Sequence, residues 1–264
     1  MKRIAVLSNL LPDAWFNGQG VAVVRETACT RLEPVTLRAG MCGYLAFLPA
    51  LLADVDGLVL TTCCDQMRRA AEWLNDDTRV FLFNMPSTHH QERLLEAEKA
   101  RLERWVARLP ARENAGLERS DARTHTQTGH SPEGHAIGVI GGHFCGDRQA
   151  IERFFNQHGI RLSLWGCEGG ECVGDVAQRP NDALYEQLKE LVRQRQLAGL
   201  IVARTTWCDL WRLAAVRLKE LLDVPVLEWV TDGQSHGQPF PDATSATRLE
   251  AFCELVSARS KEGS

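Results

Sequence analysis

Three features are absent from this 264-residue sequence, and each absence narrows the class of protein. No apolar run approaches the roughly 18 residues that a membrane-spanning helix needs, so no membrane association is expected. There is no excess of basic residues, because the formal net charge is −4, and nucleic acid is therefore not an expected partner. No compact C-x-x-C pair is present, so the spacing of the cysteines does not identify a metal by itself.

The N-terminus, MKRIAVLSNLLPDAWF, is basic and then apolar, as a secretory signal would be. Its apolar run is short, however, because Pro12 and Asp13 interrupt it and no small-residue cleavage site follows. We expect a first strand here rather than a signal peptide, and we expect the protein to be cytoplasmic.

Cysteine, in contrast, is plentiful. In a cytoplasmic chain these residues are not expected to pair as disulfides. Some should be buried and inert, since a free cysteine behaves as a small hydrophobic residue, and Cys29 and Cys253 lie in apolar sequence. The others need a chemical reason, and metal ligation is the leading one. The nine cysteines are Cys29, Cys42, Cys63, Cys64, Cys145, Cys167, Cys172, Cys208 and Cys253.

Short β-rich runs alternate with amphipathic helical patterns along the chain. This alternation predicts an α/β fold with parallel sheets flanked by helices. A polar stretch at 110–134 cannot bury a core and is predicted to be a linker. It separates an N-terminal Rossmann-like, cluster-binding lobe at 1–109 from a C-terminal Rossmann-like lobe at 135–264. Strands are predicted at 3–7, 33–37, 57–61, 79–83, 136–140, 160–165, 199–203 and 224–230.

One motif occurs in both lobes. GLVLTTCCDQMRR in the first and GLIVARTTWCDLWR in the second each join a buried strand and two threonines to Cys-Asp-x-x-Arg at the start of a helix. Ligands of open α/β sheets bind at the carboxyl ends of strands, and a helix N-terminus favours a thiolate. Cys64 and Cys208 are therefore candidate ligands that can converge between the lobes. Asp65 and Asp209 are candidate capping or outer groups of the same site.

Cys42, in AGMCGYL, occupies the same kind of position, after a predicted strand and before a helical stretch. A lone cysteine at a strand end is more often structural than a ligand. The repeated motif favours ligation for Cys64 and Cys208, whereas the local pattern leaves both roles open for Cys42. The three thiolates would suit zinc or an iron–sulfur cluster, and their spacing does not distinguish the two.

Several segments together resemble the 2-hydroxyacyl-CoA dehydratase family, which includes benzoyl-CoA reductase-type subunits and double-cubane proteins. The segments are MCGYL, DGLVLTTCCDQMRR, NMP after a strand, GGHFCGD, and WCDLWRLAAVRLKELLDVPVLEWVTD. The resemblance implies that Cys42, Cys64 and Cys208 ligate a [4Fe–4S] cluster, since the family cysteine directly precedes the aspartate. Cys63 and Cys145 are candidates for additional ligands if the cluster is larger.

The resemblance also implies a function. The chain would be the iron–sulfur subunit of an enzyme that removes water from an (R)-2-hydroxyacyl-CoA by radical chemistry. Its expected partners are the acyl-CoA, an ATP-dependent iron–sulfur activator, and a related second subunit or a second copy of the chain. The alternative is a double-cubane-like low-potential reductase or an electron-relay protein without acyl-CoA turnover. A non-enzymatic module, with zinc or nothing at the cysteines in place of the cluster, is a further alternative.

Overall fold

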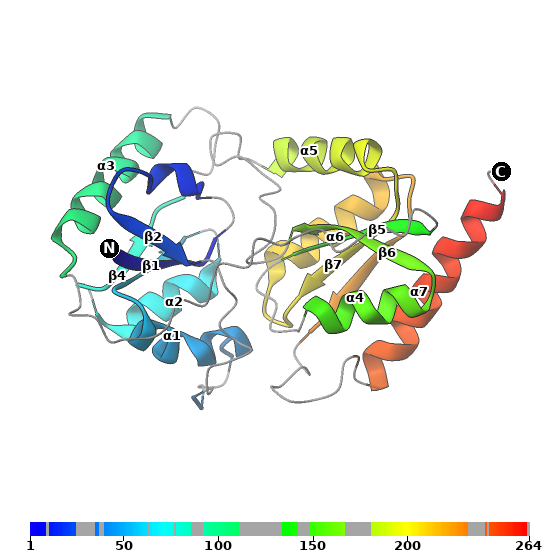
Figure 1. The fold of residues 1–264 in the computed structure, drawn as a ribbon, viewed down its shortest axis with the longest axis horizontal. Coiled ribbons are helices and arrows are strands. Elements are labelled where there is room, and N and C mark those ends of the chain that lie inside the picture. The colour runs from blue at the N-terminus through cyan, green and yellow to red at the C-terminus, as the bar shows by residue number, and fades with distance from the viewer. Residues whose placement is uncertain are drawn as a thin grey trace.

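The computed structural model describes residues 1–8, 11–24, 35–36, 40–62, 64–76, 78–85, 92–110, 134–141, 148–166, 181–231, 241 and 243–262. Two lobes lie side by side in Figure 1, and each contains one four-stranded sheet. All strand pairs in both sheets are parallel, and helices cover the sheets. The predicted α/β class with two Rossmann-like lobes is confirmed.

The first sheet has the strand order β2-β1-β3-β4. Its central strand β3 is buried along its whole length, as expected for a parallel strand covered on both faces. Successive side chains of β3 point to opposite faces: Leu58 and Leu60 pack in the cluster of α1 and α2, whereas Val59 packs in the cluster of α3. The elements are β1 (Lys2–Val6), η1 (Asp13–Trp15), β2 (Val21–Val24), η3 (Gly43–Phe47), α1 (Leu48–Asp54), β3 (Gly57–Thr61), α2 (Asp65–Leu74), β4 (Val80–Phe83) and α3 (Glu92–Arg108).

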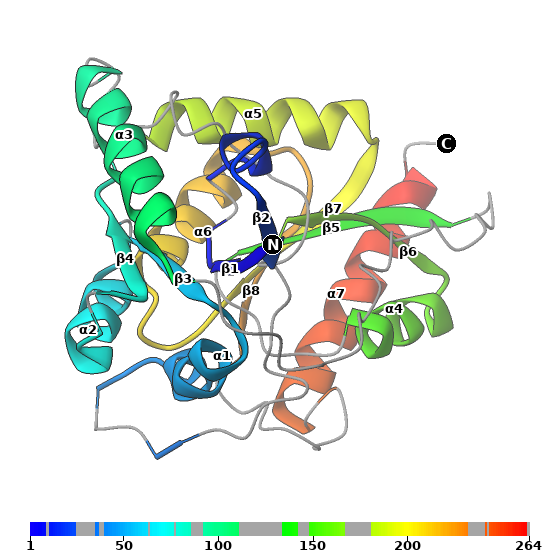
Figure 2. The ribbon, with the colours of Figure 1, turned by 60° about the vertical axis from the view of Figure 1, so that its left-hand side comes forward.

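The second sheet repeats this arrangement with the order β6-β5-β7-β8. Figure 2 shows α5 on one side of this sheet and α4 and α7 on the other. Strand β7 takes the place that β3 has in the first sheet, and each of the two leads directly into a helix that begins with Cys-Asp. The elements are β5 (His135–Gly141), α4 (Arg148–Gln157), β6 (Ile160–Gly166), α5 (Asn181–Gln194), β7 (Leu197–Arg204), α6 (Asp209–Leu221), β8 (Val226–Val230) and α7 (Ala243–Glu262).

One predicted strand differs from the structure. The second strand of the first sheet is Val21–Val24, which pairs with β1 in parallel. The strand predicted at 33–37 is absent at residues 35–36, and its other residues lie outside the described part of the chain. The run VAVV has only four residues and no polar alternation, so its pairing with β1, rather than its own pattern, makes it a strand.

The predicted lobe limits at 109 and 135 stay predictions, because residues 111–133 lie outside the described residues. Within the described ranges, no helix combines the length and the apolar character needed to cross a membrane.

The backbone conformation and the close neighbours of position 141, at the carboxyl end of β5, require a glycine there. Its φ is +151°, a conformation that side-chain-bearing residues rarely adopt, and a Cβ there would lie 1.8 Å from the carbonyl oxygen of Ala203. We expect Gly141→Ala to lower the free energy of unfolding by about 3 kcal/mol or more, because backbone strain and overpacking add. Urea unfolding followed by circular dichroism measures this change.

Gly159→Ala is the matched control for Gly141→Ala. Gly159 also has a positive φ, +69°, but a Cβ added there would meet no heavy atom within 4 Å. Its substitution should cost only about 1–2 kcal/mol, the usual penalty for a left-handed alanine. Equal losses for the two variants would contradict the proposed close approach of Gly141 to Ala203.

Candidate functional site

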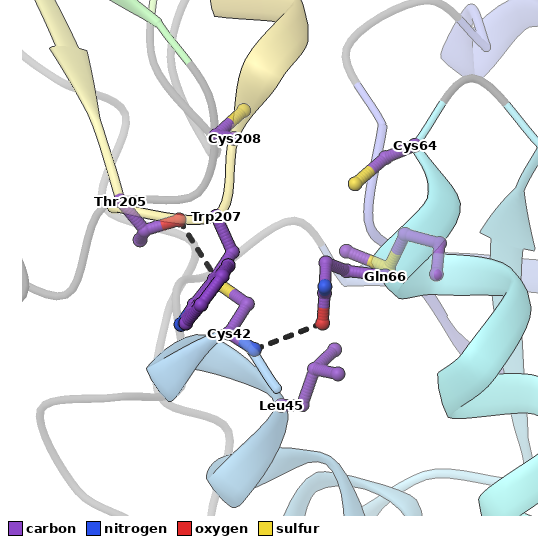
Figure 3. A pocket seen from close by; sticks show the side chains of 8 residues that line it. Cys42, Leu45, Cys64, Gln66, Thr205, Trp207 and Cys208 are labelled. Carbon is purple, nitrogen blue, oxygen red and sulfur yellow. Dashed lines mark hydrogen bonds between the residues drawn. The ribbon is translucent and has the colours of Figure 1, made fainter. Parts of the chain in front are cut away.

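A pocket between the two lobes brings the three predicted cysteine ligands together (Figure 3). The first lobe contributes residues from η3 and from the start of α2, and the second lobe contributes the loop between β7 and α6. The pocket spans about 310 Å³, part of which is open to solvent. It is lined by Cys42, Leu45, Cys64, Gln66, Met67, Thr205, Trp207 and Cys208.

Cys64 and Cys208 occupy equivalent places in the two lobes. Each is the N-cap residue of the helix that follows its strand, α2 or α6, and neither sulfur caps its own helix. The backbone carbonyl of Cys208 accepts a hydrogen bond from the Arg212 amide at 3.1 Å, so the cysteine joins the first turn of α6. Both sulfurs therefore lie at helix N-termini, where the helix dipole favours a thiolate.

Gln66 fixes Cys42 to the helix that begins after Cys64. The Cys42 amide donates to Gln66 Oε1 at 2.9 Å, and Gln66 Nε2 donates to the Gly40 carbonyl at 3.2 Å. Gln66 is buried in the first turn of α2, and Cys42 is itself a buried N-cap residue of η3. The side-chain amide of Gln66 thus links the loop that carries Cys42 to helix α2, which begins directly after Cys64.

A contact across the lobes completes the pocket. Cys42 Sγ lies 3.2 Å from the hydroxyl oxygen of Thr205, and either group can donate in this hydrogen bond. If Cys42 is a thiolate, the donor has to be Thr205, since a thiolate has no proton to give. Trp207, which follows two residues later, is 54% exposed at the edge of the pocket.

The two aspartates of the repeated motif lie elsewhere. Asp65 and Asp209 are in the first turns of α2 and α6, as predicted, but both are exposed and neither lines the pocket. Asp209 pairs with Arg212 at 3.2 Å on the outer surface of α6. Their position suits stabilisation of the helix N-termini better than contact with a ligand. The additional candidates Cys63 and Cys145 lie outside the described residues.

The described residues offer no site for a single metal ion, and the predicted ligation of a cluster by Cys42, Cys64 and Cys208 stays a prediction. Among the described residues, no three or more His, Cys, Asp or Glu side chains are placed to hold one metal ion. Cys42, Cys64 and Cys208 are all described, so their sulfurs share a pocket without converging on a point that one ion could occupy.

Comparisons with known proteins gave no family. No protein-family model matches the chain, and no curated protein matches it. Solved structures found by similarity include the laminin-binding protein Lbp of Streptococcus pyogenes, with 9% identity, a TM-score of 0.26 and coverage of 97% of this chain and 99% of that one. A variant of SsGBP has 9% identity and a TM-score of 0.25, covering 97% and 98%. A zinc(II)-bound variant of AdcAII of Streptococcus pneumoniae has 9% identity and a TM-score of 0.23, covering 99% of both chains.

These findings overturn the predicted membership of the 2-hydroxyacyl-CoA dehydratase family. No model of that family matches the chain, and no curated member of it matches either. The predicted function as the iron–sulfur subunit of a radical dehydratase is therefore wrong, and so is its alternative, a low-potential reductase or electron-relay protein. The expected partners rested on the same resemblance and stay untested. The structural likenesses are too weak to carry a function to this chain.

Several pocket residues were not predicted from the sequence. Thr205 belongs to the threonine pair that both lobes repeat, and this repetition was a usable signal. Gln66 gave no such signal, because Cys42, which it contacts, is 24 residues away in the sequence. Trp207 was not predicted either, although it directly precedes Cys208.

Removing the Gln66 amide should weaken the loop of Cys42. We expect Gln66→Leu, which copies Leu210 at the equivalent place in α6, to lower the free energy of unfolding by about 1–3 kcal/mol, because the buried Cys42 amide and the part-buried Gly40 carbonyl lose their partner. Chemical denaturation measures the loss. Gln19→Leu, which removes one part-buried bond to the Trp15 carbonyl, is the control, and an equally large effect there would contradict this account.

Cys253 should behave as an inert core thiol, unlike the pocket cysteines. It is buried on α7, and burial, aided by the negative charge of Glu250, raises the pKa of its thiol to about 12. At pH 8 the thiol is therefore protonated, and alkylation by iodoacetamide should leave it unmodified while Cys64 and Cys208, which are partly exposed, react. Mass spectrometry of the folded, metal-free protein measures this labelling, and rapid labelling of Cys253 would contradict the buried position.

Proposed function

We propose that this protein binds a thiophilic group in the pocket between its lobes, through the thiols of Cys42, Cys64 and Cys208. The observation that carries the proposal is the pocket itself, which three cysteines from three elements and two lobes line together. All three are present as thiols and not as disulfides. Three reduced thiols suit a cytoplasmic location, and we include this location in the proposal.

The thiol groups that line the pocket favour soft metals as ligands of the site. Thiolate sulfur prefers soft or borderline metals, and it does not suit hard cations such as Mg²⁺ or Ca²⁺. The two helix N-termini and the nearby Thr205 hydroxyl favour a negatively charged assembly, which several thiolates around a metal group would form. No carboxylate lines the pocket among the described residues, so the negatively charged oxygen ligands that hard ions prefer are not supplied there.

The arrangement of the sulfurs is compatible with a group larger than one ion. The three cysteines share a pocket, yet they are not placed to hold a single metal ion. In a polynuclear group each thiolate binds a different metal atom, so the sulfurs need not converge on one point. The [4Fe–4S] cluster expected from the sequence is a group of this kind and is our proposed occupant, held by Cys42, Cys64 and Cys208. When bound by three thiolates, such a cluster would leave one iron open to another ligand.

Metal analysis of the anaerobically purified full-length protein tests the proposal. We expect about four irons with matching sulfide per chain, and each of Cys42→Ser, Cys64→Ser and Cys208→Ser should lower the iron content about tenfold. Cys253→Ser is the control and should keep its iron, because Cys253 packs in the core of the second lobe, away from the pocket.

The outcomes separate the parts of this proposal. A colourless protein that holds zinc, with the zinc lost in each pocket variant, would keep the thiol site and exclude the cluster. A protein that takes up no metal, even after reconstitution with iron and sulfide, would overturn the proposed function. Iron that persists in the pocket variants would assign it to other residues.

A further inference from the structure

The second lobe supplies its whole share of the pocket from one short loop. Thr205, Trp207 and Cys208 all lie between the end of β7 and the start of α6. Within the loop, the Cys208 amide donates to the Thr205 carbonyl at 3.1 Å. The position of this loop therefore decides whether the second lobe's thiol reaches the two thiols of the first lobe.

The side chain of Arg204 holds the loop by its backbone. Arg204 Nη1 donates to the Thr205 carbonyl at 2.9 Å and to the Thr206 carbonyl at 3.3 Å. The same guanidinium is fixed from the neighbouring strand β8, because Arg204 Nε donates to Glu228 Oε1 at 2.5 Å. The two side chains are only 11% and 20% exposed, so the pair is largely shielded from water.

The backbone of Arg204 does not need this ion pair. Its carbonyl already accepts from the Thr231 amide at 2.8 Å and from the Thr231 hydroxyl at 3.1 Å. The contacts that depend on the guanidinium are therefore those to the loop and to Glu228.

The first lobe shows that the fold itself does not require a charged pair here. There, the residue before the threonine pair is Leu60, which is fully buried, and in the second lobe the same place before Thr205 is taken by Arg204. Shielded ion pairs are often no more stabilising than packed apolar side chains, because desolvation offsets their attraction. Stability alone thus gives little reason for Arg204 and Glu228, whereas the loop contacts give a specific one.

We propose that Arg204 and Glu228 are positioning residues that hold the 205–208 loop so that Cys208 completes the thiol pocket. This inference rests on the proposed function for its purpose, but the geometry that it describes can be tested without any metal.

The decisive variant is Arg204→Leu combined with Glu228→Leu. It replaces the ion pair of the second lobe by apolar side chains, as in the first lobe, where Leu60 takes the place of Arg204. We measure the rates at which iodoacetamide modifies Cys208 and Cys64 in the same metal-free molecules, and use their ratio. The ratio should change about fivefold when the loop is released, since alkylation follows the access and environment of a thiol. Urea unfolding should show an unchanged midpoint, and the iron content of the reconstituted protein should fall about tenfold.

The matched control is Arg101→Leu combined with Glu98→Leu. This pair belongs to the first lobe, and Arg101 likewise donates to a backbone carbonyl, that of Leu82. Neither residue lines the pocket, so the alkylation ratio and the iron content should stay at the wild-type values. Glu228→Gln is a milder variant, in case the double leucine variant does not fold, and should shift the ratio about twofold in the same direction.

An alkylation ratio that stays at the wild-type value in both the double leucine variant and Glu228→Gln would overturn the positioning role. A ratio that shifts while the wild-type protein binds no iron would support the positioning role and refute the proposed function. The two hypotheses are thus separated by independent measurements.

Discussion

The hydrogen bond between the Cys42 sulfur and the Thr205 hydroxyl joins the two lobes at the pocket. The site depends on the relative position of the lobes at this contact. Cys42 and Cys64 belong to one lobe, and Cys208 belongs to the other. Parallel sheets make such a meeting straightforward, because all their strands end at the same edge, where loops and helix N-termini gather. Two such edges that face each other can assemble a site that neither lobe contains alone.

The sequence predicted the part of this architecture that local patterns control. Buried strands such as Gly57–Thr61 and amphipathic helices such as Asp65–Leu74 carry their periodicity in neighbouring residues, and the repeated Cys-Asp motif marked the two strand ends that line the pocket. The strand Val21–Val24 was missed, and its parallel pairing with β1 defines it. The family was wrong because short strand–loop–helix motifs specify local geometry and not ancestry or chemistry.

The polar groups that shape the site were beyond prediction for a different reason. Gln66 acts on Cys42, 24 residues away, and Arg204 pairs with Glu228, also 24 residues away. Nothing in the neighbouring sequence distinguishes these side chains from ordinary helix or strand residues. The repeat even gives misleading guidance, because Gln66 corresponds to Leu210 and Arg204 corresponds to Leu60. The two lobes therefore position their thiols through different side-chain hydrogen bonds.

This asymmetry has a physical consequence for any group bound in the pocket. The first lobe holds two thiols in a fixed relation, since the Gln66 amide joins the loop of Cys42 to the helix behind Cys64. The second lobe adds one thiol on a loop that the Arg204 guanidinium holds by its carbonyls. An occupant that binds all three gains the third thiolate only when the lobes and the loop are already in place. Its affinity therefore includes the free energy of that alignment, and interactions that order the loop beforehand strengthen binding without touching the occupant.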